Sequence, residues 1–117
     1  MHQTEMTALL RSIQIAQPKT HQDDDGIWTS SIFKEPIDGA VPVKQLGLEG
    51  DRCADPENHG GVDKAILGYS ADHLDFWQQE LGQPVPGGGF GENLTFEGLV
   101  ETTVCIGDQW SIGSVLL

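Results

Sequence analysis

Two glycine-containing loops carry the residue types best suited to binding a ligand. The first covers residues 58–64 and contains His59, Gly60, Gly61 and Lys64. Paired glycines let the backbone come close to a ligand and turn successive N–H groups toward an anion. His59 can donate or accept a hydrogen bond, and Lys64 adds a positive charge. The loop predicts an anion site, and the alternative is an ordinary glycine turn with a solvent-exposed histidine and lysine.

The second loop places a carboxylate and an amide directly after a glycine–aromatic–glycine turn. Its residues are Gly89, Phe90, Gly91, Glu92 and Asn93. Glu92 offers hydrogen-bond acceptors and Asn93 offers both donors and acceptors, a pattern that suits the edge of a pterin or a purine. A β-turn in which both side chains bond nearby backbone groups would use the same residues. Local chemistry leaves both interpretations open.

No metal-ligand or catalytic set stands out elsewhere in the chain. Cys53 and Cys105 form no CxxC pair, and with His59 and His73 they do not have the spacing of a zinc site. Cys105 lies between two apolar residues, which predicts an inert side chain within a strand. We therefore expect no metal ligands among these residues, and the sequence leaves the catalytic residues unknown.

Short strands separated by turns must position both loops. Alternating or β-branched segments predict strands over residues 9–15, 27–33, 41–48, 64–69, 93–96 and 102–106, with a last strand from residue 110. Residues 84–89 contain two prolines and three glycines, so they predict an irregular loop. Residues 1–8 are polar and are expected to form a flexible N-terminus before a single domain over residues 9–117. The fold class is mainly β, as a barrel or a sandwich.

One segment predicts a helix, over about residues 71–81. Ser70 is a suitable N-cap and Gly82 a suitable C-terminal stop. Apolar residues recur at helical spacing at Leu74, Trp77 and Leu81, so Trp77 and its neighbour Phe76 are expected in the core.

Composition excludes several classes of function. The chain has 117 residues, with 6 basic and 18 acidic side chains, so its formal net charge is 6 − 18 = −12. Residues 65–117 contain no lysine or arginine. Nucleic acids and anionic membranes would be repelled, and no stretch approaches the roughly 20 apolar residues of a membrane span. A soluble cytoplasmic domain is expected.

The ordered series of motifs resembles the MOSC domain family, and within it the YiiM-like branch. The resemblance covers about residues 10–117. It rests on Gly47–Asp51, on His59–Ala65 followed by Tyr69, His73 and Trp77, on Phe90–Thr95, on Gly98–Leu99 and on Val104–Asp108.

The resemblance implies a barrel-like fold that binds the molybdenum cofactor. Relatives include the C-terminal domain of molybdenum cofactor sulfurase and the mitochondrial amidoxime-reducing component, and YiiM-like members are linked to reduction of N-hydroxylated compounds such as hydroxylaminopurines. A small-molecule substrate and a separate electron-supplying partner are implied. Carried over by position, the cofactor-binding residues are His59, Gly60, Gly61 and Lys64, near the phosphate or pterin, with Gly91, Glu92 and Asn93 at the wall of the site.

This sequence departs from the family in one respect. In the family a Pro-Arg-x-Pro-Cys segment follows the strand that begins like Trp110, and its cysteine is expected to ligate molybdenum. The present chain ends at Leu117, and neither Cys53 nor Cys105 matches that position. The expectation is a C-terminally incomplete domain that is inactive alone. The alternatives are a non-catalytic carrier of the cofactor, or a structural remnant that assembles with another chain, for example as a homodimer.

Overall fold

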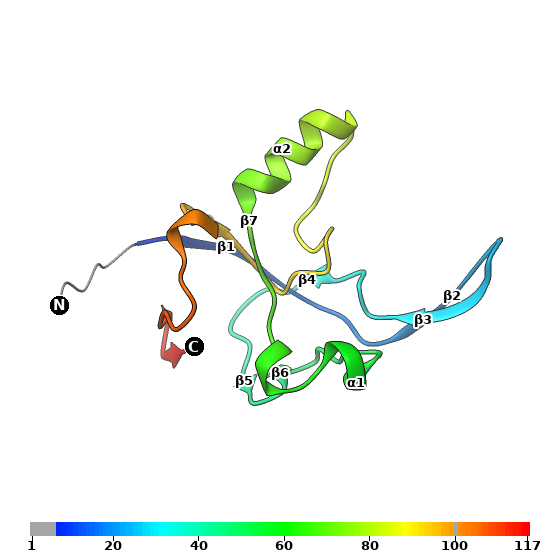
Figure 1. Ribbon diagram of the computed structural model, residues 1–117, viewed down its shortest axis with the longest axis horizontal. Coiled ribbons are helices and arrows are strands. Elements are labelled where there is room, and N and C mark those ends of the chain that lie inside the picture. Colours follow the sequence, from blue (N-terminus) through cyan, green and yellow to red (C-terminus); the bar gives the residue numbers. More distant parts are fainter. Residues whose placement is uncertain (1–6, 100) are drawn as a thin grey trace.

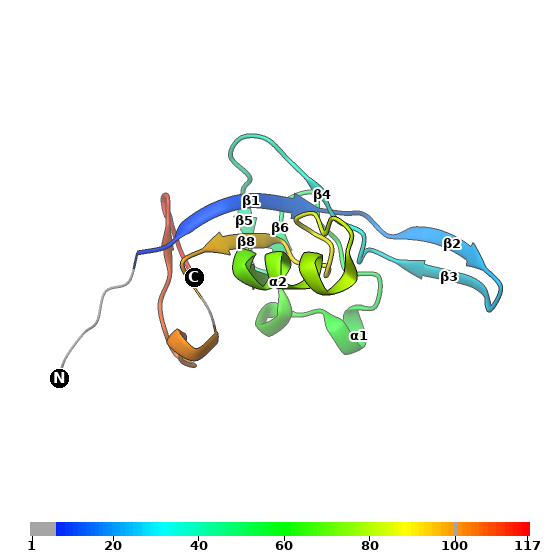
Figure 2. The ribbon, with the colours of Figure 1, turned by 90° about the horizontal axis from the view of Figure 1, so that it is seen from above.

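A four-stranded sheet forms the centre of the computed structural model, which describes residues 7–99 and 101–117. The sheet has the order β4-β1-β8-β7, from β1 (Leu9–Ile15), β4 (Glu35–Pro36), β7 (Gly68–Ser70) and β8 (Leu94–Glu97). β1 is antiparallel to β4 and β8, whereas β7 and β8 are parallel. Figure 2 shows β1 and β8 side by side, with α2 (Ala71–Leu81) beside them. The prediction of strand 9–15 is confirmed.

Three further pairs of strands lie outside this sheet. They are β2 (Lys19–Asp23) with β3 (Gly26–Ser30), β5 (Val43–Lys44) with β6 (Gly47–Leu48), and β9 (Ser111–Ile112) with β10 (Val115–Leu116). The β2–β3 hairpin extends beyond the end of β1 and contributes to a longest dimension of 54 Å (Figure 1). The described residues are mainly β, as predicted, but their strands do not close into a barrel.

Residues 41–48 form a hairpin rather than the single strand that was predicted. Val43 pairs with Leu48, and Lys44 pairs with Gly47. Gly47 adopts a φ of 132°, and a Cβ there would lie 2.8 Å from the carbonyl oxygen of Ala65. The turn therefore needs glycine at this position.

The helix over residues 71–81 is confirmed as α2. The Ser70 hydroxyl accepts a hydrogen bond from Asp72 N, and Gly82 ends the helix with a φ of 65° while its N–H donates to Gln78 O. The core prediction for its aromatic residues is wrong, because Phe76 is 51% and Trp77 39% exposed. Only Ala71 and Leu74 of this helix are buried, since α2 packs on β7 and β8 through its first turn and then leads away from the sheet (Figure 1).

Three other segments differ from the sequence prediction. The loop after Asp51 contains a short helix α1 (Pro56–His59) and a 3-10 turn, η1 (Val62–Lys64), so that only residues 68 and 69 of the predicted strand 64–69 pair, as part of β7. The predicted strand 102–106 is not formed. Residues 102 and 103 belong to the 3-10 turn η2 (Glu101–Thr103), and residues 104–106 follow it. There the Asp108 carboxylate accepts from Cys105 N at 2.7 Å and closes a turn, which leaves Cys105 exposed rather than in a strand.

The core combines a small apolar cluster with buried polar side chains. Leu48, Leu94 and Phe96 form its buried apolar centre. The largest fully buried side chains are Gln14, Glu92 and Thr95. Of the predicted flexible N-terminus, residues 1–6 lie outside the described residues. None of the described helices is long and apolar enough to cross a membrane.

Candidate functional site

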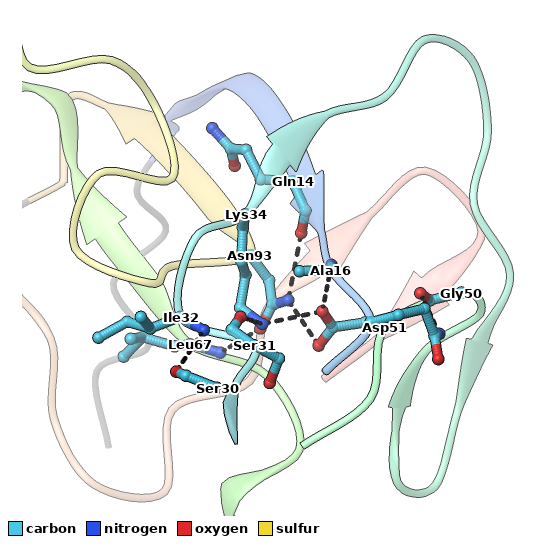
Figure 3. Close-up of polar contacts among 11 residues, drawn as sticks. Gln14, Ala16, Ser30, Ser31, Ile32, Lys34, Gly50, Asp51, Leu67 and Asn93 are labelled. Atoms are coloured by element: carbon cyan, nitrogen blue, oxygen red, sulfur yellow. Dashed lines mark hydrogen bonds and ion pairs between the residues drawn. The ribbon is translucent and has the colours of Figure 1, made fainter. Parts of the chain in front are cut away.

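A buried ion pair joins the segment after β3 to the segment after β6. Lys34 Nζ donates to Asp51 Oδ1 at 2.8 Å, and the two side chains are only 9% and 10% exposed (Figure 3). Lys34 Nζ also donates to Ser31 O at 3.2 Å, and Asp51 Oδ1 accepts from Ala16 N at 2.8 Å. Because neither charge faces bulk water, each depends on the other for stabilisation.

Asn93 extends this network across the sheet. Its Nδ2 donates to Asp51 Oδ2 at 3.0 Å and to Gln14 O at 3.2 Å, and its Oδ1 accepts from Leu67 N at 3.0 Å (Figure 3). The side chain is 3% exposed. Asn93 therefore ties β1, the Asp51 segment and the segment before β7 to the start of β8, and these three bonds occupy both ends of its amide.

Glu92 is the adjacent residue and has a different environment. It is 0% exposed, and its Oε1 accepts from Phe90 N at 3.1 Å. Its Oε2 is buried and has no hydrogen-bond partner among the described residues. A buried carboxylate oxygen without a donor is costly, so this atom marks a place where a donor group is missing.

Glycines hold the turn before Glu92 close to neighbouring segments. Gly91 has a φ of 79°, and a Cβ there would lie 2.9 Å from Ile32 Cγ1. At Gly88 a Cβ would lie 2.6 Å from the carbonyl oxygen of Lys34. The glycine-rich loop therefore rests on the segment that carries Lys34, which places Glu92 beside the ion pair network.

The loop that contains the other predicted residues is built around α1. Asp55 caps this helix by accepting from Asn58 N, and hydrogen bonds from the side chain and then the backbone of Asn58 hold the pKa of Asp55 below its ordinary value of 3.8. A lowered pKa means that this cap stabilises the fold at higher pH and weakens as pH falls below that value. Gly60 packs too closely on Pro56 for any side chain, since a Cβ would lie 2.8 Å from Pro56 Cα.

Gly61, His59 and Lys64 are exposed on this loop. Gly61 has a φ of 101° and open space around it. Lys64 Nζ donates to Asn58 O at 2.9 Å and otherwise faces solvent. Packing explains Gly60 and backbone conformation explains Gly61, so neither glycine requires a ligand. His59 and Lys64 are the predicted side chains of this loop that are exposed and could contact a ligand.

The two predicted segments are connected through the backbone of Leu67 rather than through a direct bond. No hydrogen bond or ion pair within residues 7–99 and 101–117 joins His59 or Lys64 to Glu92 or Asn93. An open cavity of about 420 Å³ is lined by neighbours of these segments, among them Val62, Asp63 and Leu94, but by none of the predicted site residues. The backbone after Lys64 then reaches Leu67, whose carbonyl oxygen accepts from Asn93 N at 2.8 Å.

Comparison with known proteins gives the family. The family model described as MOSC domain matches residues 55–117, which is more than half of the chain. The chain belongs to the MOSC domain family. It is 40% identical over 106 residues to the uncharacterised protein YflK of Bacillus subtilis, covering 91% of this chain and 48% of that protein. It is 37% identical over 91 residues to protein YiiM of Escherichia coli, covering 75% of this chain and 41% of YiiM.

Other similar proteins include a reductase and a solved structure. A reductase of Gibberella moniliformis is 37% identical over 93 residues, which are 76% of this chain and 16% of that enzyme. The crystal structure of YiiM from Geobacillus stearothermophilus superposes with a TM-score of 0.68 at 32% identity, covering 94% of this chain and 48% of that chain. The chain thus spans about half the length of the curated YflK and YiiM proteins that it matches, at 48% and 41%.

Sequence reasoning missed part of this candidate site. Lys34 and Gln14 were not singled out, because a lysine before a proline-containing turn and a glutamine within a strand give no local signal of burial. Gln14 is 0% exposed; its amide nitrogen donates to Asn93 O at 2.9 Å, and its oxygen accepts from the hydroxyls of Ser12 and Thr95 and from Gly88 N. No group of three or more metal-binding side chains is found in the described part of the chain.

Proposed function

We propose that this chain is a molybdenum-cofactor-binding MOSC domain whose parent protein reduces N-hydroxylated compounds. Membership of the family, similarity to YiiM proteins and similarity to a reductase support the proposal. The observation that carries it is the buried Glu92 Oε2, which has no donor among the described residues and lies in the loop that the family motif includes.

The residues present fit the organic part of the cofactor. A pterin ring offers N–H donors, and the unpartnered Glu92 oxygen is an acceptor for one of them once the preceding glycine-rich turn moves aside, because the side chain is 0% exposed in this structure. The phosphate of the cofactor is an anion, and Lys64 with the exposed N–H of the Gly61 region would hold it. When bound, the cofactor supplies two-electron redox chemistry at molybdenum.

The protein's own contribution is binding and orientation. Asn93 and the Lys34–Asp51 pair fix the backbone on either side of Glu92, so that its carboxylate is held in place before a ligand arrives. The overall reaction balances as R–NHOH plus two electrons and two protons giving R–NH2 and water, with the N–O bond broken. The electrons come from a separate electron-donating protein. Two free cysteines, Cys53 and Cys105, suit the reducing cytoplasm, where we place the domain.

Cofactor retention by the purified chain tests this proposal. The chain is mixed with molybdenum cofactor released from another molybdoenzyme, passed over a desalting column and assayed for pterin fluorescence. We expect Lys64→Ala to weaken retention by roughly tenfold to a hundredfold, the value of one charge-assisted contact. Lys19→Ala makes the same charge change on the β2–β3 hairpin and is the matched control. His59→Ala combined with Lys64→Ala should abolish retention.

Glu92→Gln provides a second variant of nearly the same size. It should weaken pterin retention while the free energy of unfolding stays the same or rises, because it removes a buried charge without creating a cavity. Retention that is unchanged in both the Lys64 and the Glu92 variants would overturn the site. Because the chain is expected to be inactive alone, turnover of an N-hydroxylated compound is assayed with the parent protein and a chemical reductant, and cofactor retention without turnover there would favour the non-catalytic carrier over the reductase.

A further inference from the structure

An exposed aromatic surface lies beside the candidate site. It consists of Phe76 and Trp77 from α2 and Phe90 from the glycine-rich loop, which are 51%, 39% and 37% exposed. We call these three residues the aromatic face. Their rings form a continuous chain: the Phe76 and Trp77 centroids are 5.3 Å apart and the Trp77 and Phe90 centroids 6.3 Å apart. Contiguous exposed apolar surface of this kind marks interaction sites.

The geometry of α2 keeps this face free in the described structure. The helix contacts the sheet through Ala71 and Leu74, and every residue from Asp75 to Leu81 is exposed. Figure 1 shows the helix extending away from the sheet beyond β7. Phe76 lies on the side of the helix opposite to Leu74, because two residues along a helix are turned by about 200°.

Acidic residues flank Phe76 at one end of the aromatic face. Asp72 and Glu80 are exposed and lie one helical turn before and after Phe76, at the i−4 and i+4 positions that share its side of the helix. The sequence from residue 65 to residue 117 has no lysine or arginine to balance them. A second copy of this chain, with a net charge of −12, would bring like charges together. The charge pattern therefore favours a partner with basic groups around an apolar centre.

We propose that the aromatic face docks a protein whose contact surface has a lysine- and arginine-rich rim around an apolar centre, and that this partner is the electron donor. The second clause rests on the proposed function, which needs electrons from another protein. The face is continuous with the candidate site, since Phe90 N donates to Glu92 Oε1 at 3.1 Å. A partner bound to the aromatic face would therefore lie next to the turn that precedes Glu92.

Binding to a basic redox protein tests the surface without any cofactor. The probe is a lysine-rich c-type cytochrome, whose exposed haem edge is the apolar centre, and the Kd is measured by calorimetry with the whole chain. We expect Phe76→Ser to weaken binding at least about tenfold, as for a central aromatic contact. Asp72→Asn with Glu80→Gln should weaken it about two- to thirtyfold, and added salt should do the same to the wild type.

Matched variants on the β2–β3 hairpin separate a specific face from general acidity. Ile27→Ser removes an apolar side chain that is 73% exposed, and Asp24→Asn with Asp25→Asn removes two exposed charges. Both should bind the cytochrome like the wild type. Circular dichroism checks that each variant retains α2.

Three results would overturn the proposal. Binding could be unaffected by Phe76→Ser and by the Asp72 and Glu80 changes. The hairpin variants could lose as much affinity as the α2 variants, which would show attraction to net charge alone. Sedimentation could show a dimer that Phe76→Ser dissociates, which would assign the face to a second copy. Because the assay needs no cofactor, failure of cofactor retention and failure of docking are separate outcomes.

Discussion

At the scale of single residues, the site depends on charges that are buried together. The Lys34–Asp51 pair is nearly enclosed, and Asn93 connects it to the loop of Glu92. A buried pair is costly to assemble from water, but removal of one partner is far more costly, because the other charge is left without compensation. The pair therefore acts as a requirement for the local fold rather than as a simple gain in stability.

Lys34→Met is expected to lower the free energy of unfolding by about 3–5 kcal/mol, since Asp51 is left as an unpaired buried carboxylate. Urea unfolding at neutral pH measures the change. Lys44→Met is the control, because the Lys44–Glu49 pair is 3.3 Å long with side chains 65% and 56% exposed, and its loss should cost below about 1 kcal/mol. Equal losses of unfolding free energy in Lys34→Met and Lys44→Met would contradict the role given to Lys34. Adding Asp51→Asn to Lys34→Met should recover part of the loss.

At the scale of elements, glycines in unusual backbone conformations shape the loops, and these glycines differ in what they tolerate. Gly61 has a φ of 101° and a ψ of 173°, a region that is essentially restricted to glycine. Gly82 has a φ of 65° and a ψ of 22°, the left-handed helical region in which asparagine is also found. Neither has an atom within 4 Å of an added Cβ, so backbone conformation alone distinguishes them.

Gly61→Asn should therefore cost about 1–3 kcal/mol in unfolding free energy. Gly82→Asn should cost below about 1 kcal/mol, because asparagine tolerates the left-handed helical region at the end of a helix. Chemical denaturation of the two variants in parallel gives the comparison. A larger loss of unfolding free energy in Gly82→Asn than in Gly61→Asn would contradict the importance given to the backbone conformation of Gly61.

Local signals in the sequence were sufficient for some elements only. Strand β1 and helix α2 were predicted because alternation in the first, and the Ser70 and Gly82 caps of the second, are properties of neighbouring residues. The segment 102–106 has the composition of a strand, but the Asp108 carboxylate bonds Cys105 N and closes a turn instead. The spacing of Trp77 predicted a core position, yet the direction in which α2 leaves β7 keeps that residue exposed.

The candidate site also combines residues that local sequence signals reveal with residues that they do not. The glycines, Glu92 and Asn93 could be selected from the sequence because they form short motifs. The partners that fix them could not, because Lys34, Asp51 and Gln14 meet Asn93 or its neighbours only after strands from distant parts of the chain pair. The sequence separation between Gln14 and Asn93 is 79 residues.

At the scale of the whole molecule, excess negative charge opposes the folded state. The formal net charge is −12, and like charges repel more strongly when the chain is compact. The acidic residues include exposed side chains on α2 and on the β2–β3 hairpin, where salt can screen them. Stability should therefore depend on ionic strength more than it does for a neutral domain of this size.

Raising sodium chloride from about 20 mM to about 500 mM is expected to raise the Tm, because the screening length falls from about 20 Å to about 4 Å. Differential scanning calorimetry measures the shift. Asp24→Asn with Asp25→Asn changes the net charge to −12 + 2 = −10 and should reduce the salt-induced shift. A Tm that falls with salt would mean that attractive ion pairs outweigh the repulsion.

The polar interior described above also limits how this sequence can change over time. Most protein cores drift by exchanging one apolar side chain for another of similar volume, with little effect on the fold. Here the largest fully enclosed side chains are Gln14, Glu92 and Thr95, and each makes at least one specific hydrogen bond. Random mutagenesis should therefore find fewer tolerated substitutions at these three positions than at Leu48 or Leu94. At these three positions the need to match hydrogen-bond donors and acceptors, more than side-chain volume, limits which substitutions the protein tolerates.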